Sequence, residues 1–135
     1  MPHALVVDDN PIILLEATDI LEDAGFEVFT AYDTHQAVRQ LEARGDDISL
    51  LFTDVELPGH LDGFGLARFA ATHWTHMRIL VASGQMKPKD GDLPDGAVFV
   101  GKPFSAAVVH TRLHEILAEH QKPEALRQIR PIDLG

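Results

Sequence analysis

The sequence predicts an α/β domain in which five parallel strands form one doubly wound sheet covered by helices on both faces. Five short apolar runs alternate along the chain with segments of helical periodicity. Parallel strands need crossover connections, and those crossovers are usually helices, so this alternation favours a parallel sheet. Several of the apolar runs end in a charged or polar residue, which is typical of strands that stop at a functional edge.

The first apolar run, residues 4–7, predicts a strand that is buried on both faces and ends at two acidic residues. Asn10 then suits the N-cap of a helix that has Pro11 at its first position. Helical spacing of apolar residues continues until Gly25, where we expect the helix to end.

The middle of the chain repeats this unit. Residues 26–31 predict a second strand, and Thr34 suits the N-cap of a helix that ends near Gly45. A third apolar run at residues 48–53 again ends in an acid, Asp54. This run has the character of a central, fully buried strand.

The remaining regular elements are two strands and two helices. A helix is expected from about Asp62, followed by a strand at residues 78–82. A fifth strand is expected at residues 97–100, and the final long helix begins near Ser105.

Two segments depart from this alternation of strands and helices. Residues 85–96 contain two Pro and two Gly, so we expect a loop with at most a short or distorted helix in place of a regular fourth helix. We assign residues 1–120 to one domain and residues 121–135 to a C-terminal tail with one helical turn around residues 124–129.

Composition limits the possible functions. The net charge is −10, so direct binding to nucleic acid is not expected. The chain has no Cys, which excludes disulfides and thiolate chemistry. No signal peptide or membrane-spanning run is apparent, so a soluble cytoplasmic protein without membrane contact is expected.

The predicted strands deliver reactive side chains to one edge of the sheet. Asp8 and Asp9 follow the first strand, Asp54 ends the third, Ser83 the fourth, and Lys102 the fifth. In open parallel sheets the functional crevice lies outside the carboxyl ends of the strands. Clustered carboxylates favour a hard divalent cation such as Mg²⁺, and a phosphoryl group would meet positive charge and a hydroxyl there. One carboxylate could act as the nucleophile.

These residues lie within motifs that resemble the signatures of response-regulator receiver (CheY-like) domains of bacterial two-component systems. The resemblance covers about residues 3–118 and rests on four motifs in the family's order and spacing: Val6-Val7-Asp8-Asp9-Asn10; Phe52-Thr53-Asp54-Val55-Glu56-Leu57-Pro58-Gly59 with Asp62-Gly63; Val81-Ala82-Ser83-Gly84; and Phe99-Val100-Gly101-Lys102-Pro103-Phe104. It implies a flavodoxin-like fold.

The resemblance implies that Asp54 is the phosphoacceptor. It also implies that Asp8 and Asp9 hold Mg²⁺, Asp9 more directly, while Glu56 offers its backbone carbonyl. The donor would be a sensor histidine kinase or a phosphotransfer protein. The chain would then act as a signalling phosphoacceptor that catalyses only its own phosphorylation and dephosphorylation, with a downstream protein as its target.

By the same resemblance, Ser83 and Lys102 bind the phosphoryl oxygens. Phe99 matches the aromatic switch position, and the bond between Lys102 and Pro103 matches a peptide that is usually cis in the family. Because residues 85–96 lack the family's regular fourth-helix pattern, the usual output surface is not expected in its ordinary form.

Other interpretations remain open from the residues themselves. Asp8 and Asp9 could simply cap the first helix, and Phe99 could be an ordinary core aromatic. A Mg²⁺ phosphatase of the haloacid-dehalogenase type would require a second Asp two residues after the nucleophile, where Glu56 stands. A non-phosphorylated binding module of the same fold is a further alternative. The His110 and His114 pair has helical spacing but is expected on a solvated helix face rather than at a metal.

Overall fold

The computed structural model describes residues 2–134 and contains one parallel five-stranded sheet in the order β2-β1-β3-β4-β5. The strands are β1 (His3–Val7), β2 (Glu27–Ala31), β3 (Ile48–Asp54), β4 (Arg78–Ser83) and β5 (Val98–Gly101). The helices are α1 (Pro11–Asp23), α2 (Thr34–Arg44), α3 (Gly63–His73), α4 (Ala106–Ile116) and α5 (Glu124–Arg127), with 3-10 turns at η1 (Gly45–Asp47) and η2 (Glu119–Gln121). The predicted doubly wound fold is confirmed.

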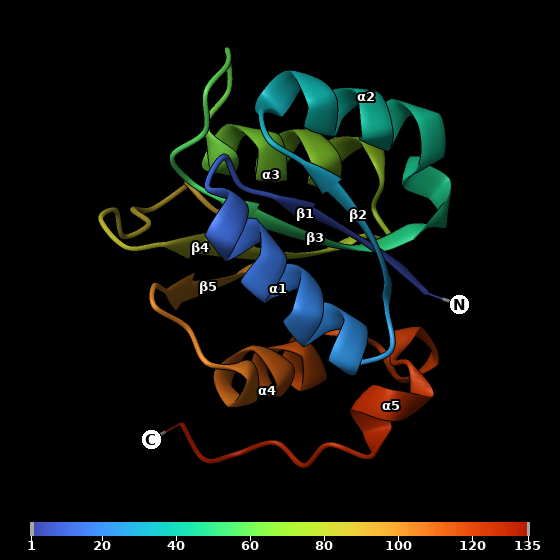
Figure 1. Cartoon of the computed structure of the whole chain (residues 1–135). Helices are drawn as coiled ribbons and strands as arrows, with labels where there is room; N and C mark the ends of the chain where they lie inside the picture. The colour runs from blue at the N-terminus through green and yellow to red at the C-terminus, as the bar shows by residue number, and fades with distance from the viewer. Residues whose placement is uncertain (1, 135) are drawn as a thin grey trace.

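Helices cover both faces of the sheet, with α2 and α3 on one side and α1 and α4 on the other (Figure 1). Alternate side chains of each central strand therefore enter two separate cores. Val6 and Phe52 belong to the core beneath α1 and α4, whereas Leu5 and Leu51 belong to the core beneath α2 and α3. This two-sided burial explains why the strands read as continuous apolar runs.

The first helix begins as its sequence predicts. The Asn10 side chain accepts hydrogen bonds from the backbone N–H groups of Ile12 and Ile13, and Pro11 is the first helical residue. The helix stops before Gly25, which has a φ of 99°. At that left-handed φ a residue with a side chain would be strained, which explains the glycine.

The second helix begins one residue away from the predicted cap. Asp33, not Thr34, is the N-cap, and its Oδ1 accepts from Gln36 N at 2.8 Å. The Thr34 hydroxyl instead donates to the carbonyl oxygen of Leu61 at 2.6 Å. Thr34 is thus the buried first residue of α2 and is bonded to the loop after β3, a contact that no local pattern reveals.

The segment between β4 and β5 has no helix, as predicted from its Pro and Gly content. It forms an extended loop beside the carboxyl ends of β4 and β5 (Figure 1). The Arg68 side chain donates to the carbonyl oxygen of Asp92 at 2.8 Å, and Leu93 packs against the core on the α2–α3 face.

The residues after α4 fold back on the domain. Gln121 donates to the carbonyl oxygen of His76 at 2.8 Å and accepts from the Arg78 side chain at 3.1 Å. Leu126, in α5, is fully buried in the core beneath α1 and α4. The helical turn predicted in this region is present, and the division of the chain at residue 120 stays a prediction. Among the described residues, no helix has the length and apolar character needed to span a lipid bilayer.

We expect Leu126→Ala to lower the free energy of unfolding by about 2–5 kcal/mol, the usual cost of emptying a buried leucine site. Ile132→Ala is the matched control, because the Ile132 side chain is 47% exposed and its loss should cost less than about 0.5 kcal/mol. Urea unfolding measures both. Equal costs for the two variants would show that α5 is not part of the cooperative core.

Candidate functional site

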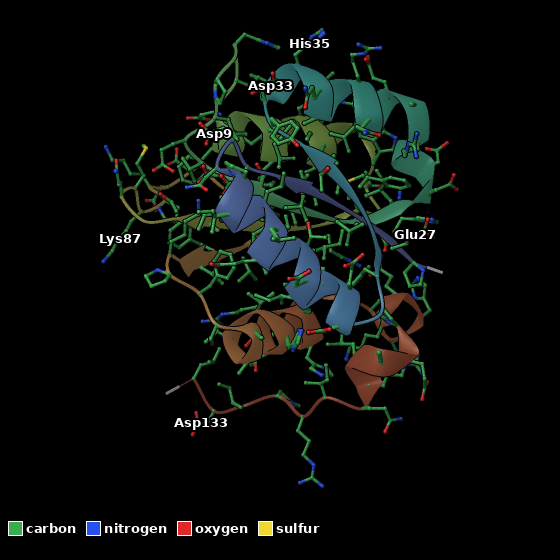
Figure 2. The ribbon with its side chains drawn as sticks, viewed as in Figure 1. Asp9, Glu27, Asp33, His35, Lys87 and Asp133 are labelled. Carbon is green, nitrogen blue, oxygen red and sulfur yellow. The ribbon has the colours of Figure 1, made fainter. Side chains whose placement is uncertain are left out.

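Three carboxylates meet at the carboxyl ends of the two central strands. Asp8 and Asp9 follow β1, and Asp54 ends β3, which pairs with β1 through Val7 and Thr53. One oxygen from each of the three carboxylates lies within 4.8 Å of the others. Asp8 and Asp54 are buried, whereas Asp9 is exposed in the loop before α1 (Figure 2).

Lys102 joins the two buried carboxylates. Its Nζ lies 2.9 Å from Asp8 Oδ2 and 2.9 Å from Asp54 Oδ1. Its backbone N–H donates to the carbonyl oxygen of Ser83, which fixes the loop after β5 beside β4. The peptide bond between Lys102 and Pro103 is cis, as the motif implies. The predicted strand ends thus bring a cation and its carboxylate partners together.

Ser83 ends β4 and is buried, but its hydroxyl does not bond to Asp54. It donates to Glu56 Oε1 at 2.6 Å. The Ser83 Oγ atom also accepts the backbone N–H groups of Gln85 at 3.2 Å and Met86 at 3.0 Å. The resemblance to receiver domains implied a role for the backbone carbonyl of Glu56 but none for its side chain. An acid two residues after Asp54 was the only available signal for its side chain.

The surroundings of the site raise the pKa values of Asp54 and Lys102 and lower that of Glu56. Burial, together with the negative charge of Asp8, raises the pKa of Asp54 to about 6 despite its hydrogen bond with Lys102. Burial opposes ionisation of Glu56, but the Ser83 hydroxyl and other donors outweigh it and lower the pKa of that carboxyl. Burial also disfavours the charged form of Lys102, yet its bonds with Asp54 and Asp8 raise its pKa. Lys102 therefore stays protonated at neutral pH.

The raised pKa of Asp54 predicts a pH-dependent stability difference between the metal-free wild type and Asp54→Asn. Because the folded-state pKa of about 6 exceeds the ordinary value of 3.8, Asp54 destabilises the fold increasingly as pH rises through this window. The stability of Asp54→Asn relative to wild type should thus grow by about 2–3 kcal/mol between about pH 4 and pH 7. Urea unfolding in EDTA measures it. A difference that stays constant with pH would contradict the raised pKa.

The donor set fits a hard divalent cation. Three carboxylates face one ammonium group, so negative charge exceeds positive charge among these side chains. Oxygen ligands with excess negative charge are what Mg²⁺ prefers, and exposed Asp9 leaves the site open to water and to a substrate. Asp8 also accepts the Asn10 backbone N–H at 2.9 Å through its Oδ1, which leaves its other oxygen for Lys102.

The Asp62-Gly63 pair brings α3 close to the strand that carries Asp54. Asp62 caps α3 by accepting from Gly65 N at 2.8 Å, and Gly63 N donates to the carbonyl oxygen of Val55 at 2.7 Å. A Cβ atom on residue 63 would collide with the carbonyl oxygen of Asp54. Only glycine permits this close approach, which explains why it follows the capping acid.

Phe99 lies in β5, which β4 separates from β3 and its terminal residue Asp54. It is half-buried in β5 opposite Val81 of β4 and packs against the core on the α2–α3 face. Leu93 and Ala97, from the loop before β5, pack against the same core. The Phe99 ring and the end of the irregular segment therefore pack against one common core.

His110 corrects one expectation, because it does not lie on a solvated helix face. It is 6% exposed, and its Nε2 donates to the carbonyl oxygen of Ile20 at 2.9 Å. His114 Nε2 donates to the carbonyl oxygen of Ile129 at 2.7 Å. The first ring joins α4 to α1 and the second joins α4 to the C-terminal tail, so both have structural partners.

The chain is similar to known signalling proteins. The family model described as "Response regulator receiver domain" matches residues 4–114. Over 120 residues the chain is 34% identical to the regulatory protein VanRc of Enterococcus gallinarum, covering 87% of this chain and 51% of that protein. It is 32% identical over 118 residues to the transcriptional regulatory protein CpxR of Escherichia coli K12, covering 87% and 50% respectively. The chain thus spans about half the length of these two curated relatives.

A solved structure agrees with this assignment. The crystal structure of a response regulator receiver protein from Sinorhizobium medicae superposes with a TM-score of 0.76 at 30% identity, over 85% of this chain and 93% of that one. The parallel sheet order and the acidic cluster after β1 and β3 fit the same family. This chain belongs to the response-regulator receiver domains of two-component signal transduction.

Proposed function

We propose that this receiver domain accepts a phosphoryl group on Asp54 from a sensor histidine kinase or a phosphotransfer protein. The observation that carries the proposal is the position of Lys102 Nζ, 2.9 Å from both Asp8 and Asp54, with Asp9 beside them. The buried carboxylate of Asp54 is then in contact with the Lys102 ammonium group. The neighbouring carboxylates offer oxygen ligands for a divalent cation.

In the proposed step an Asp54 oxygen attacks phosphorus while the bond between phosphorus and the donor's imidazole nitrogen breaks. The product is an acyl phosphate, and the departing imidazole takes up a proton. With a pKa of about 6, Asp54 is mostly ionised at neutral pH and can act as the nucleophile. Lys102 offsets charge on the phosphoryl oxygens, and little further covalent chemistry is required.

The residues that would hold Mg²⁺ are Asp9 and Asp54, with Asp8 beside them and the backbone carbonyl of Glu56 as a further oxygen. When bound, the ion supplies positive charge that neutralises the phosphoryl oxygens. The three carboxylate side chains lie close enough together to share one ion. Phosphoryl transfer is therefore expected to require the metal.

We expect Asp9→Asn to weaken Mg²⁺ binding by about tenfold or more, because a charged oxygen ligand is replaced by a neutral one. The matched control is Asp19→Asn, an exposed acid on the same helix-loop unit that is not part of the carboxylate cluster. Titration calorimetry measures both affinities. Unchanged affinity in Asp9→Asn would show that the ion binds elsewhere.

Phosphorylation would be read out through a conformational change. The phosphoryl group would draw the Ser83 hydroxyl toward Asp54, and Phe99 would then move within its half-buried position. Because Phe99 and the end of the irregular segment at residues 85–96 pack against one common core, that segment would change most and would form the surface for a downstream protein.

The proposal is tested with a small phosphodonor and Mg²⁺. Intact-mass spectrometry should show one added phosphoryl group, and none when EDTA replaces the metal. Multiple turnover of a small phosphate ester without a stable adduct would favour the phosphatase alternative. No incorporation from any donor, including sensor kinases of the source organism, would favour the non-phosphorylated binding module.

A further inference from the structure

We infer that the Glu56 side chain is a latch, which holds the Ser83 hydroxyl until a phosphoryl group is present on Asp54. In this role Glu56 is a positioning residue that acts through Ser83. The inference deepens the proposed function and rests on it, because it concerns how the same site reports phosphorylation.

The latch follows from the hydrogen-bonding capacity of a hydroxyl group. A serine hydroxyl has one proton to donate and two lone pairs to accept with. In Ser83 the proton goes to Glu56 at 2.6 Å, and the oxygen accepts from Gln85 N and Met86 N. The hydroxyl has no further donor capacity. It can bond to a phosphoryl oxygen only by giving up Glu56.

The resting bond is a strong one to break. A short hydroxyl–carboxylate bond is charge-assisted, and Ser83 is only 3% exposed, so water competes poorly for it. A phosphoryl group on Asp54 changes this balance, since its oxygens are also anionic acceptors and their charge repels the Glu56 carboxylate. Glu56 therefore raises the free-energy cost of the active state until phosphate is present.

Release of Ser83 is coupled to the loop that follows β4. The two N–H groups that donate to Ser83 Oγ belong to Gln85 and Met86, the first residues of the irregular segment. If rotation about the Ser83 Cα–Cβ bond carries Oγ toward Asp54, these two N–H groups lose their acceptor. The same segment continues to Leu93 and Ala97, which pack against the core that Phe99 contacts. The latch thus ties the position of the segment to occupancy of the site.

The test is a double-mutant cycle on binding of beryllofluoride, an acyl-phosphate mimic, to the full chain in saturating Mg²⁺. We expect Glu56→Gln to tighten binding about fivefold or more, because a neutral amide holds the Ser83 proton less strongly than a carboxylate. In a Ser83→Ala background only the relief of charge repulsion remains, so the same substitution should tighten binding by about twofold or less. Glu42→Gln, an exposed glutamate on α2, should have no effect.

A second variant separates the hydrogen bond from simple charge repulsion. Glu56→Asp keeps the charge but shortens the side chain by one methylene, so it should also tighten binding if the bond to Ser83 is what matters. Tightening by Glu56→Gln that is equal with and without the Ser83 hydroxyl would overturn the latch and leave charge alone as the cause. Wild-type protein that binds no beryllofluoride would overturn the proposed function and the latch with it.

Hydrogen exchange gives an independent reading. Beryllofluoride should accelerate exchange of the Gln85 and Met86 amides several-fold, since both lose the Ser83 acceptor. The Gln36 amide is the internal control, because it donates to Asp33 Oδ1 at 2.8 Å at the start of α2, outside the segment at residues 85–96. Unchanged exchange at Gln85 and Met86 would contradict the release of Ser83.

Discussion

Replacing Asp54 with Ala is expected to abolish phosphoryl incorporation from a small phosphodonor. The substitution removes the carboxylate that is buried at the end of the central strand and lies in contact with Lys102. Asp54 is buried at the end of β3, the middle strand of the sheet, with Asp9 beside it. Intact-mass spectrometry in Mg²⁺ measures the result, and peptide mapping of the wild type should locate the group on Asp54.

The control for this loss is Asp46→Ala. Asp46 is an exposed acid in η1, which precedes β3, whereas Asp54 lies at the opposite end of that strand. That variant should incorporate phosphate to the wild-type extent. Incorporation by Asp54→Ala at the wild-type level, with mapping to Asp8 or Asp9, would show that the nucleophile had been assigned to the wrong carboxylate.

Replacing Lys102 with Met should lower the free energy of unfolding of the metal-free protein by about 3 kcal/mol. This is the usual cost of removing one partner of a buried ion pair. Its Nζ contacts the buried carboxylates of Asp8 and Asp54, which would otherwise repel each other. Lys122→Met is the matched control. That lysine pairs with exposed Glu119, and an exposed pair contributes little to stability, so this loss should be clearly smaller.

The same variant should bind Mg²⁺ more tightly and yet accept phosphate more slowly. The ammonium group and the metal ion compete for the same carboxylates, so removing the first favours the second. Loss of a cation at the phosphoryl oxygens should slow incorporation about 100-fold. Calorimetry and timed mass spectrometry measure the two effects. Weaker Mg²⁺ binding in Lys102→Met would contradict competition between the two cations.

Much of the fold could be predicted from local patterns. The central strands β1, β3 and β4 are buried on both faces, so their apolar runs mark them without reference to the rest of the molecule. The Asn10-Pro11 start of α1 and the absence of a helix in residues 85–96 follow equally from short-range preferences of the backbone.

Other features depended on residues far apart in sequence. Thr34 reads as a helix cap, yet its hydroxyl bonds to Leu61 while Asp33 caps the helix. His110 has the spacing of a surface pair, yet it is buried against α1. A long-range acceptor decided the side-chain position in both cases, and such acceptors leave no mark in local sequence.

The sequence by itself determined the parallel sheet and which residues stand at its carboxyl edge. The carboxyl ends of all strands lie along one edge of such a sheet, so Asp8, Asp54 and Lys102 were expected at that edge. Only the tertiary structure decided which of them bond, because hydrogen bonds depend on directions and distances of a few tenths of an ångström. The bond between Ser83 and Glu56 is the clearest case: both residues were expected at this edge, and packing alone selected Glu56 as the acceptor of the Ser83 proton.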